Sequence, residues 1–280
     1  MRVGLGLPTT VPSVNAELIL NWAREAEREK FSTLGVFDRL AYDSWDPLIA
    51  LAAAASVTSR IGLATAVLNG PLYNTAALAK ALASLDVVSN GRLVVGLAIG
   101  ARETDYAVAG IDARGRGQRL TEQLLALRTH WEEGQPGPRP AQSGGPRLLV
   151  GGLSDAAFAR LARYAHGYLH GGGPPKLFAR AAEKARAAWT DAGRPDKLHL
   201  WGTAYYALGQ EEVEAGSRYL KDYYAFTGPF AEKVAAGLLT SSAALREFVQ
   251  GYTDAGCDEL LLFPTVAHLS QVTRLAEALG

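Results

Sequence analysis

The sequence predicts a single-domain α/β protein, a closed (β/α)8 barrel of the TIM type, on three observations. Eight short apolar runs alternate with eight helical stretches along the 280 residues. The runs are almost continuously apolar, as in parallel strands whose outer face is covered by helices. None is polar enough for the edge of an open sheet, so one barrel over residues 1–280 is favoured over a doubly wound sheet.

Each strand candidate is a short run dominated by aliphatic or aromatic residues. The eight runs are Arg2–Pro8, Thr33–Asp38, Ile61–Asn69, Arg92–Gly100, Arg147–Gly152, Gly167–Gly173, Leu198–Leu208 and Glu259–Pro264. Because the runs would form the inner layer, the segments between them must supply the helices.

The intervening segments carry apolar residues at helical spacing. In the first segment, Leu18, Trp22 and Ala26 share one helix face. Pro47 suits the first turn of the second helix, and Ser154 suits the N-cap of the fifth. The helices are expected at about 16–30, 46–57, 75–88, 117–133, 154–164, 175–192, 210–255 (interrupted at 227–229) and 268–279.

The stretch "GQPGPRPAQSGGP" (Gly134–Pro146) is the one long turn-rich segment, and its composition is typical of a domain linker. The strand–helix alternation resumes directly after it. We therefore interpret it as a loop within one domain.

Composition narrows the class of partner. The 28 basic and 28 acidic residues give no net charge, so neither nucleic acid nor an anionic membrane is an expected partner. The single cysteine, Cys257, cannot form an internal disulfide, which fits a reducing compartment. The N-terminus lacks the apolar run of a signal peptide, and Leu48–Val57 is too short to span a bilayer. A cytoplasmic protein is expected.

In barrels of this type the ligand site forms at the C-terminal ends of the strands. Two consecutive strand ends carry glycine clusters, Gly151-Gly152 and Gly171-Gly172-Gly173. Glycine allows close approach of the backbone to an anion, and Ser154 adds a hydroxyl at a helix N-terminus. The clusters indicate a phosphate pocket, the alternative being that they only make tight turns.

His170 is the one histidine at a strand end, so it is a candidate catalytic residue, the alternative being a hydrogen-bonded loop histidine. The other histidines share no spacing typical of metal ligands, so no metal site is expected. A G-x-S-x-G turn, a P-loop and a G-x-G-x-x-G motif after the first strand are absent, which argues against a serine hydrolase and the usual nucleotide sites.

Four longer stretches of the sequence resemble those of a known protein family. "TSRIGLATAVLNGP", "ALAKALASLDVVSNGRLVVGLAIGARETDY", "LLVGGLSDAAFARLARYAHGYL" and "YTDAGCDELLLFP" resemble the bacterial luciferase-like family of flavin- or F420-dependent oxidoreductases, and the resemblance covers nearly the whole chain. It implies the same barrel, a homodimer and a small-molecule substrate.

The resemblance also implies where the cofactor lies. Family members often carry a non-prolyl cis peptide at the end of the third strand, against the isoalloxazine or deazaflavin ring, and the matching peptide here is Ala66–Val67. The cofactor phosphate would lie near the fifth and sixth strand ends. The expected cofactor-binding residues are Asp38, Ala66, Val67, Asn69, Ile99, Gly100, Gly151, Gly152, Ser154, Gly171 and Gly172.

The chain departs from the family pattern at two positions. Where many members have a histidine after the second-strand acidic residue, this chain has Arg39. Where the F420-dependent members commonly have a glutamate after the fourth-strand glycines, it has Ala101. The usual acid/base pair is therefore missing or relocated, and Arg102, Glu103 and Asp105 are nearby replacements for it. The candidate catalytic residues are Arg39 and Glu103, with Arg39 suited to an anionic substrate or a ring carbonyl. The alternative is that Asp38 and Arg39 form an ion pair that holds the loop.

Three functions follow from the resemblance. The favoured one is a two-component monooxygenase that uses reduced FMN, supplied by a separate flavin reductase, and O2, for which a dry apolar pocket is required. The second is F420-dependent hydride transfer, which needs a proton donor. The third is a cofactor-binding relative without turnover.

Overall fold

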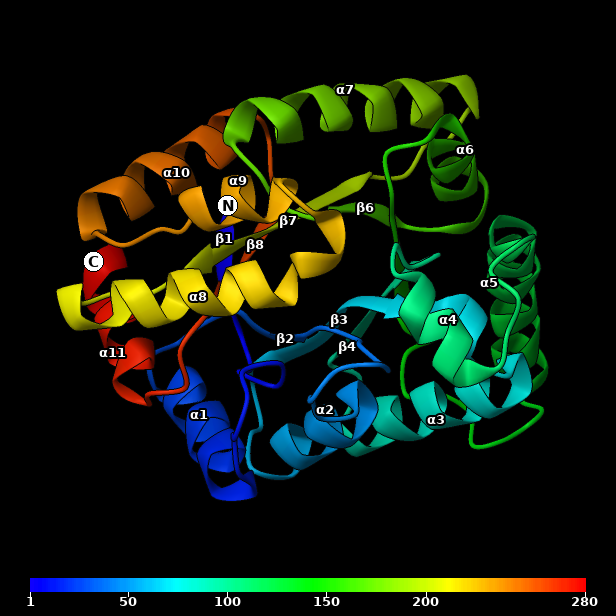
Figure 1. Ribbon diagram of the computed structural model, residues 1–280. Helices are drawn as coiled ribbons and strands as arrows, with labels where there is room; N and C mark the ends of the chain where they lie inside the picture. The colour runs from blue at the N-terminus through cyan, green and yellow to red at the C-terminus, as the bar shows by residue number, and fades with distance from the viewer.

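The computed structural model describes residues 1–280 as a closed barrel of eight parallel strands (Figure 1). Each strand pairs with the next, and β8 closes onto β1, for example Leu5 opposite Leu262. The strands are β1 (Arg2–Gly6), β2 (Thr33–Val36), β3 (Gly62–Asn69), β4 (Leu93–Ala98), β5 (Arg147–Gly151), β6 (Gly167–His170), β7 (His199–Tyr206) and β8 (Glu259–Pro264). The predicted fold class is confirmed.

Helices follow the strands and surround the barrel. They are α1 (Ala16–Arg28), α2 (Pro47–Ser56), α3 (Thr75–Val88), α4 (Glu103–Ala109), α5 (Arg116–Glu133), α6 (Asp155–Tyr164), α7 (Pro175–Asp191), α8 (Val213–Tyr223), α9 (Phe230–Ala236), α10 (Ser242–Asp254) and α11 (Ser270–Leu279). None of them combines the length and hydrophobicity needed to cross a membrane.

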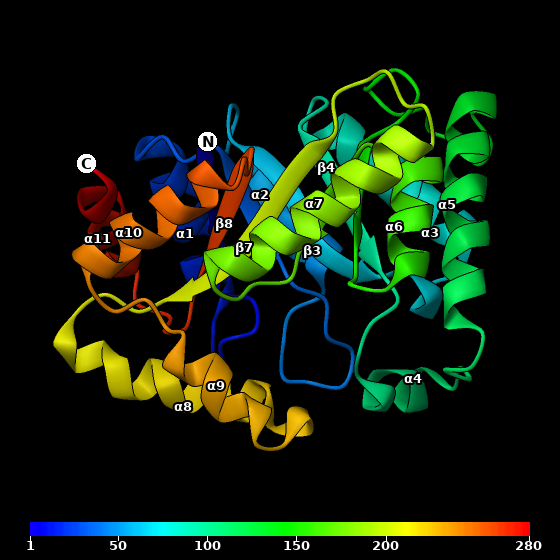
Figure 2. The ribbon, with the colours of Figure 1, turned by 90° about the horizontal axis from the view of Figure 1, so that it is seen from above.

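The helical layer differs from the expectation in two places. The seven-residue helix α4 was not predicted. The expected helical region 210–255 is three helices, and the break between α9 and α10 includes Leu239, which forms a parallel bridge with Tyr206. Figure 2 shows α4, α8 and α9 together along one end of the barrel.

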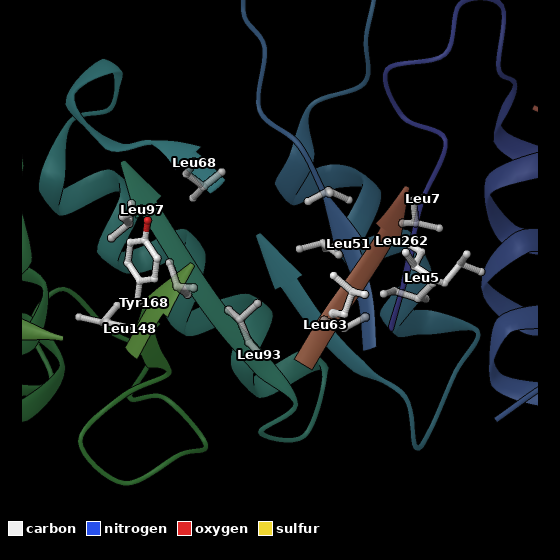
Figure 3. Close-up of a cluster of buried hydrophobic side chains, with 14 of the residues drawn as sticks. Leu5, Leu7, Leu51, Leu63, Leu68, Leu93, Leu97, Leu148, Tyr168 and Leu262 are labelled. Carbon is white, nitrogen blue, oxygen red and sulfur yellow. The ribbon is translucent and has the colours of Figure 1, made fainter. Parts of the chain in front are cut away.

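The larger core lies between the strands and the helices. Alternate strand residues point outward into it, such as Leu93 and Leu97 on β4, and Leu51 of α2 packs among them (Figure 3). Burial of these side chains contributes about 25 cal/mol for each Å² of apolar surface removed from water. The strands are apolar throughout because their other face is buried as well.

A second, smaller core fills the barrel interior. It contains Leu149, Trp201, Leu261 and Phe263. Gly6 of β1 faces this interior, where a Cβ atom would lie 2.2 Å from the Phe263 ring. The interior is therefore packed with side chains, and space for a ligand is available only at the strand ends.

The turn-rich segment 134–146 packs against the domain, as expected for an internal loop. The backbone N–H and the side-chain amide of Gln142 donate hydrogen bonds of 2.9 and 2.6 Å to the carboxylate of Asp86. Asp86 is fully buried in α3. A buried carboxylate requires such partners, so the loop and the barrel fold as one unit.

Candidate functional site at the C-terminal strand ends

The third strand bulges at its C-terminal end. Its pairing with β4 shifts register between Thr65 and Leu68, and the Ala66–Val67 peptide is cis, as predicted from the resemblance. Gly96 of β4 faces the bulge, where a Cβ atom would lie 2.4 Å from the carbonyl oxygen of Thr65. Only glycine at this position lets β4 run so close to the bulge.

The bulge is fixed from behind by the end of β2. Asp38 Oδ2 accepts a 2.8 Å hydrogen bond from the backbone N–H of Asn69, and Asn69 Nδ2 donates to the carbonyl oxygen of Asp38 at 3.1 Å. Both side chains are buried. Gly100 adjoins them, since its Cβ would lie 2.8 Å from Asn69 Oδ1. These residues therefore join the ends of β2, β3 and β4.

Burial raises the pKa of the Asp38 carboxyl to about 6, although the Asn69 N–H and the Tyr73 hydroxyl both lower it. The carboxylates of Asp105 and Asp46 raise the pKa further. The folded protein therefore retains a proton that the unfolded chain releases near pH 4. The stability that this proton provides is complete below about pH 4 and is lost as the pH rises to about 6.

Asp38→Asn is expected to remove this pH dependence, because the amide cannot ionise and still offers an oxygen to the Asn69 N–H. The free energy of unfolding of the variant should match that of the wild type at pH 4 and exceed it by about 2–3 kcal/mol at pH 7. Urea unfolding at intervals from pH 4 to 7 measures the difference. Asp43→Asn, an exposed carboxyl in the same loop, is the matched control. Parallel pH curves for the wild type and Asp38→Asn would contradict the argument.

Two glycine turns lie beside the bulge. Gly151 borders it, since a Cβ there would touch Val67 Cγ1 and Ala98 Cβ at 3.5 Å. Gly152 and Gly171 are exposed, and a Cβ at Gly171 would meet no atom within 4 Å. Ser154 N-caps α6 and accepts from the N–H of Ala157 at 3.2 Å.

The turns therefore form an open cradle in front of the bulge. Gly172, with φ of +106°, adopts a conformation that favours glycine. Val67, Ile99 and Gly100 are only partly buried. Val67 borders the cradle beside Gly151, whereas the Ile99 side chain packs against the outer core. The predicted cofactor-binding residues are thus brought together, with Asp38 and Asn69 supporting the bulge from behind.

The carboxylate that pairs with Arg39 is Asp105 rather than Asp38. Arg39 Nε lies 3.3 Å from Asp105 Oδ2, with the two side chains 6% and 2% exposed. Asp105 Oδ1 also accepts a 2.8 Å hydrogen bond from the N–H of Ala41. The alternative of an Asp38–Arg39 ion pair is therefore wrong, because Asp38 is already bonded to Asn69 and Asp105 approaches from α4.

Aromatic rings line the mouth of the barrel above the interior core. The Phe37 ring stacks on Phe263 at 3.7 Å between centroids and lies 5.8 Å from Tyr205. Tyr223 of α8 lies 6.3 Å from Phe37, and Tyr42 meets Tyr223 edge-on at 5.2 Å. The mouth is apolar apart from the hydroxyl groups of its tyrosines and the charged groups of Arg39, Arg102 and Asp105.

Helix α8 covers this mouth and is tied to three strand-end loops. Tyr219 shares a 2.6 Å hydrogen bond with Thr10, Asp222 accepts one of 2.7 Å from Tyr42, and the Tyr223 carbonyl accepts one of 3.0 Å from Arg102. Such side-chain contacts hold α8 as a lid over the end of the barrel.

His170 and Glu103 lie apart from this mouth. The His170 ring is buried against Tyr168 and Phe178, in the outer core between β6 and α7, and burial lowers its pKa. Glu103 starts α4 with an exposed side chain that forms no ion pair. The structure therefore brings Arg39, of the three candidate catalytic residues, to the barrel mouth.

Asp105 was a candidate replacement for the missing acid/base pair, whereas its pairing with Arg39 and the tyrosines of α8 were not predicted. Asp105 lies on α4, a helix that was not predicted. Tyr219 and Tyr223 are spaced by four residues and so share a helix face. That spacing was a sign that the helix could cover the barrel mouth with its tyrosines. An aromatic pair on one helix face is, however, more often part of the hydrophobic core.

These features define a TIM-barrel protein whose site is formed by its strand-end loops. The chain belongs to the luciferase-like monooxygenase family, whose model matches residues 1–254. The family and its relatives point to oxidoreductase activity. An uncharacterized protein of Mycobacterium tuberculosis is 30% identical over 226 residues, covering 68% of this chain and 76% of that protein.

A second relative is the oxygenase component of the flavin-dependent trigonelline monooxygenase of Acinetobacter baylyi. It is 36% identical over 89 residues, which cover 31% of this chain and 25% of that protein. The family match thus extends along the chain, whereas this similarity is local.

Two solved structures share the fold. The monooxygenase RslO1 of Streptomyces bottropensis has a TM-score of 0.80 at 21% identity, covering 100% of this chain and 98% of that one. An F420-dependent secondary alcohol dehydrogenase also gives 0.80, at 16% identity with both chains fully covered. The barrel is therefore common to a monooxygenase and an F420-dependent dehydrogenase.

Proposed function

We propose that this protein is the oxygenase component of a two-component flavin monooxygenase. In this reaction reduced FMN, delivered by a separate reductase, supplies two electrons, and one oxygen atom of O2 enters a small organic substrate while the other leaves as water. The observation that carries the proposal is the chemistry of the barrel mouth, which is largely apolar and aromatic and whose buried carboxylates are both engaged by other groups of the chain.

Each buried carboxylate near the mouth is already engaged. Asp38 is bonded to Asn69, and Asp105 is paired with Arg39. His170 lies outside the mouth, and Ala101 stands where F420-dependent relatives commonly have glutamate. Hydride transfer to or from an alcohol requires a proton donor or base, whereas oxygen chemistry requires exclusion of water. The lid α8 and the rings beneath it suit the second requirement.

The residues of the cradle fit FMN. The open turn at Gly171 and the exposed Ser154 leave room for a phosphate, and the positive end of the α6 dipole faces the same region. Val67, at the bulge, would contact the flat face of the ring system. This chain's contribution is to hold the phosphate, to position the ring at the mouth and to keep water out.

Binding and oxygen uptake test the proposal. FMN and F420 are titrated separately into the protein with tryptophan fluorescence as the signal. Saturable quenching by FMN and none by F420 is expected. A flavin reductase with NADH then supplies reduced FMN, and O2 consumption is followed with and without the protein. Saturable binding of F420 without binding of FMN would overturn the assignment in favour of hydride transfer.

A further inference from the structure

We propose that Arg39 and Arg102 bind the anionic group of the substrate, which is a small organic acid with a planar apolar body. The substrate class rests on the proposed function, whereas the anion site rests on the contacts of the two arginines. The site lies under the lid helix, at the mouth of the barrel.

Arg39 is the first part of the site. Its side chain is 6% exposed, and its Nε and Nη1 atoms are buried without a hydrogen-bond partner. Asp105 is its sole ion-pair partner, at 3.3 Å and without hydrogen-bond geometry. Buried guanidinium groups normally have their donors paired, because the loss of hydration is otherwise uncompensated. The free donors of Arg39 therefore indicate a missing acceptor.

Arg102 is the second part. Its Nη2 atom donates to the Tyr223 carbonyl at 3.0 Å, while its Nε atom is buried and without a partner. The guanidinium carbons of Arg102 and Arg39 lie 4.3 and 5.2 Å from the centre of the same Tyr223 ring. Two cations that share one ring have between them one buried carboxylate, Asp105. Asp105 is paired with Arg39, so Arg102 has no carboxylate partner of its own.

The chemistry of the guanidinium group selects the ligand. Its planar fork matches the two oxygens of a carboxylate, and a charge-assisted bond of this kind is strongest where water is excluded. Aromatic rings surround the pair: Tyr42 lies 5.0 Å from the guanidinium carbon of Arg39, and Phe226 lies 4.4 Å from that of Arg102. Flat rings on these sides favour a planar apolar body attached to the carboxylate.

Substitution of Asp105 is expected to change anion affinity in the opposite direction to substitution of either arginine. As the one carboxylate beside Arg39, it competes with an incoming anion for the guanidinium group. Asp105→Asn keeps an oxygen that can accept the Ala41 N–H but removes the negative charge. The variant is therefore expected to bind an anion more tightly, whereas loss of either arginine weakens binding.

The experiment is a calorimetric titration with benzoate and with its neutral counterpart benzamide. Benzoate is expected to bind at least tenfold more tightly than benzamide. Arg39→Met and Arg102→Met should each raise the Kd for benzoate at least tenfold, and Asp105→Asn should lower it severalfold. Arg163→Met, an exposed arginine that also packs on a tyrosine ring, should leave it unchanged.

Three results overturn the proposal: equal binding of benzoate and benzamide, no benzoate binding at millimolar concentration, or unchanged affinity in both arginine variants. If Arg39→Met fails to fold because Asp105 is left unpaired, Arg39→Met/Asp105→Asn and Arg102→Met carry the test. The titrations are run with and without FMN. Arginine-dependent benzoate binding in a protein that does not bind FMN would refute the proposed monooxygenase and leave the anion site standing.

Discussion

Gly171→Asp is expected to weaken FMN binding at least tenfold while leaving the fold intact. A Cβ at this position would meet no atom within 4 Å, and the backbone is not in the left-handed region, so a side chain is accommodated. The added carboxylate would repel the phosphate of FMN. A tenfold loss of affinity corresponds to about 1.4 kcal/mol of binding free energy. Repulsion between like charges a few ångströms apart is large enough to cause this loss.

Matched variants and ligands isolate the charge. Gly171→Asn, of the same size and neutral, should change FMN affinity less than threefold, and riboflavin, which lacks the phosphate, should bind wild type and Gly171→Asp alike. Fluorescence titration at low and high salt measures both, and salt should reduce the effect. Equal FMN affinity in wild type and Gly171→Asp would place the phosphate elsewhere than the cradle.

Gly96→Ala should lower the free energy of unfolding by about 3 kcal/mol, at the upper end of the cost of overfilling a packed interior. The new methyl group would lie 2.4 Å from the backbone oxygen of Thr65, and 3.1 and 3.3 Å from Val67 and Leu169. The Thr65 hydroxyl also donates to the Gly96 carbonyl at 2.9 Å, which holds the two strands together. Neither strand is free to move away.

Gly151→Ala on the neighbouring strand is the control for this variant. Its added methyl group would make ordinary contacts of 3.4–3.5 Å, so its stability should change by less than about 1 kcal/mol. Urea unfolding followed by circular dichroism compares the two. If Gly96→Ala proves as stable as Gly151→Ala, β3 relaxes and the bulge is not held by close packing with β4.

The proposed anion site would make a largely apolar mouth selective for its substrate. The rings of Phe37, Tyr205 and Phe263 exclude water, and the lid helix closes over them. Polarity enters through the arginines at the rim. A buried cation with free donors binds an anionic group strongly, so under the two proposals made above the rim selects the substrate and the interior protects the reaction.

Much of the fold was predictable because the signals are local. Continuous apolar runs such as Leu93–Ala98 mark strands buried on both faces, and the helical period between them marks the covering layer. The short helix α4 was missed because its first turn is charged and lacks the apolar spacing of a long amphipathic helix. The glycines at 151–152 and 171–173 were placed correctly at the ends of β5 and β6, and their role in binding a phosphate stays a prediction.

The sequence by itself determined the barrel fold and the family, and it predicted that the candidate site lies at the C-terminal ends of the strands. These follow from periodicity and from local motifs. Only the tertiary structure decided which charges meet. Arg39 and Asp105 are 66 positions apart, and α8 reaches the mouth from beyond β7. Pairing of buried charges depends on distances through space, which residue spacing along the chain does not encode.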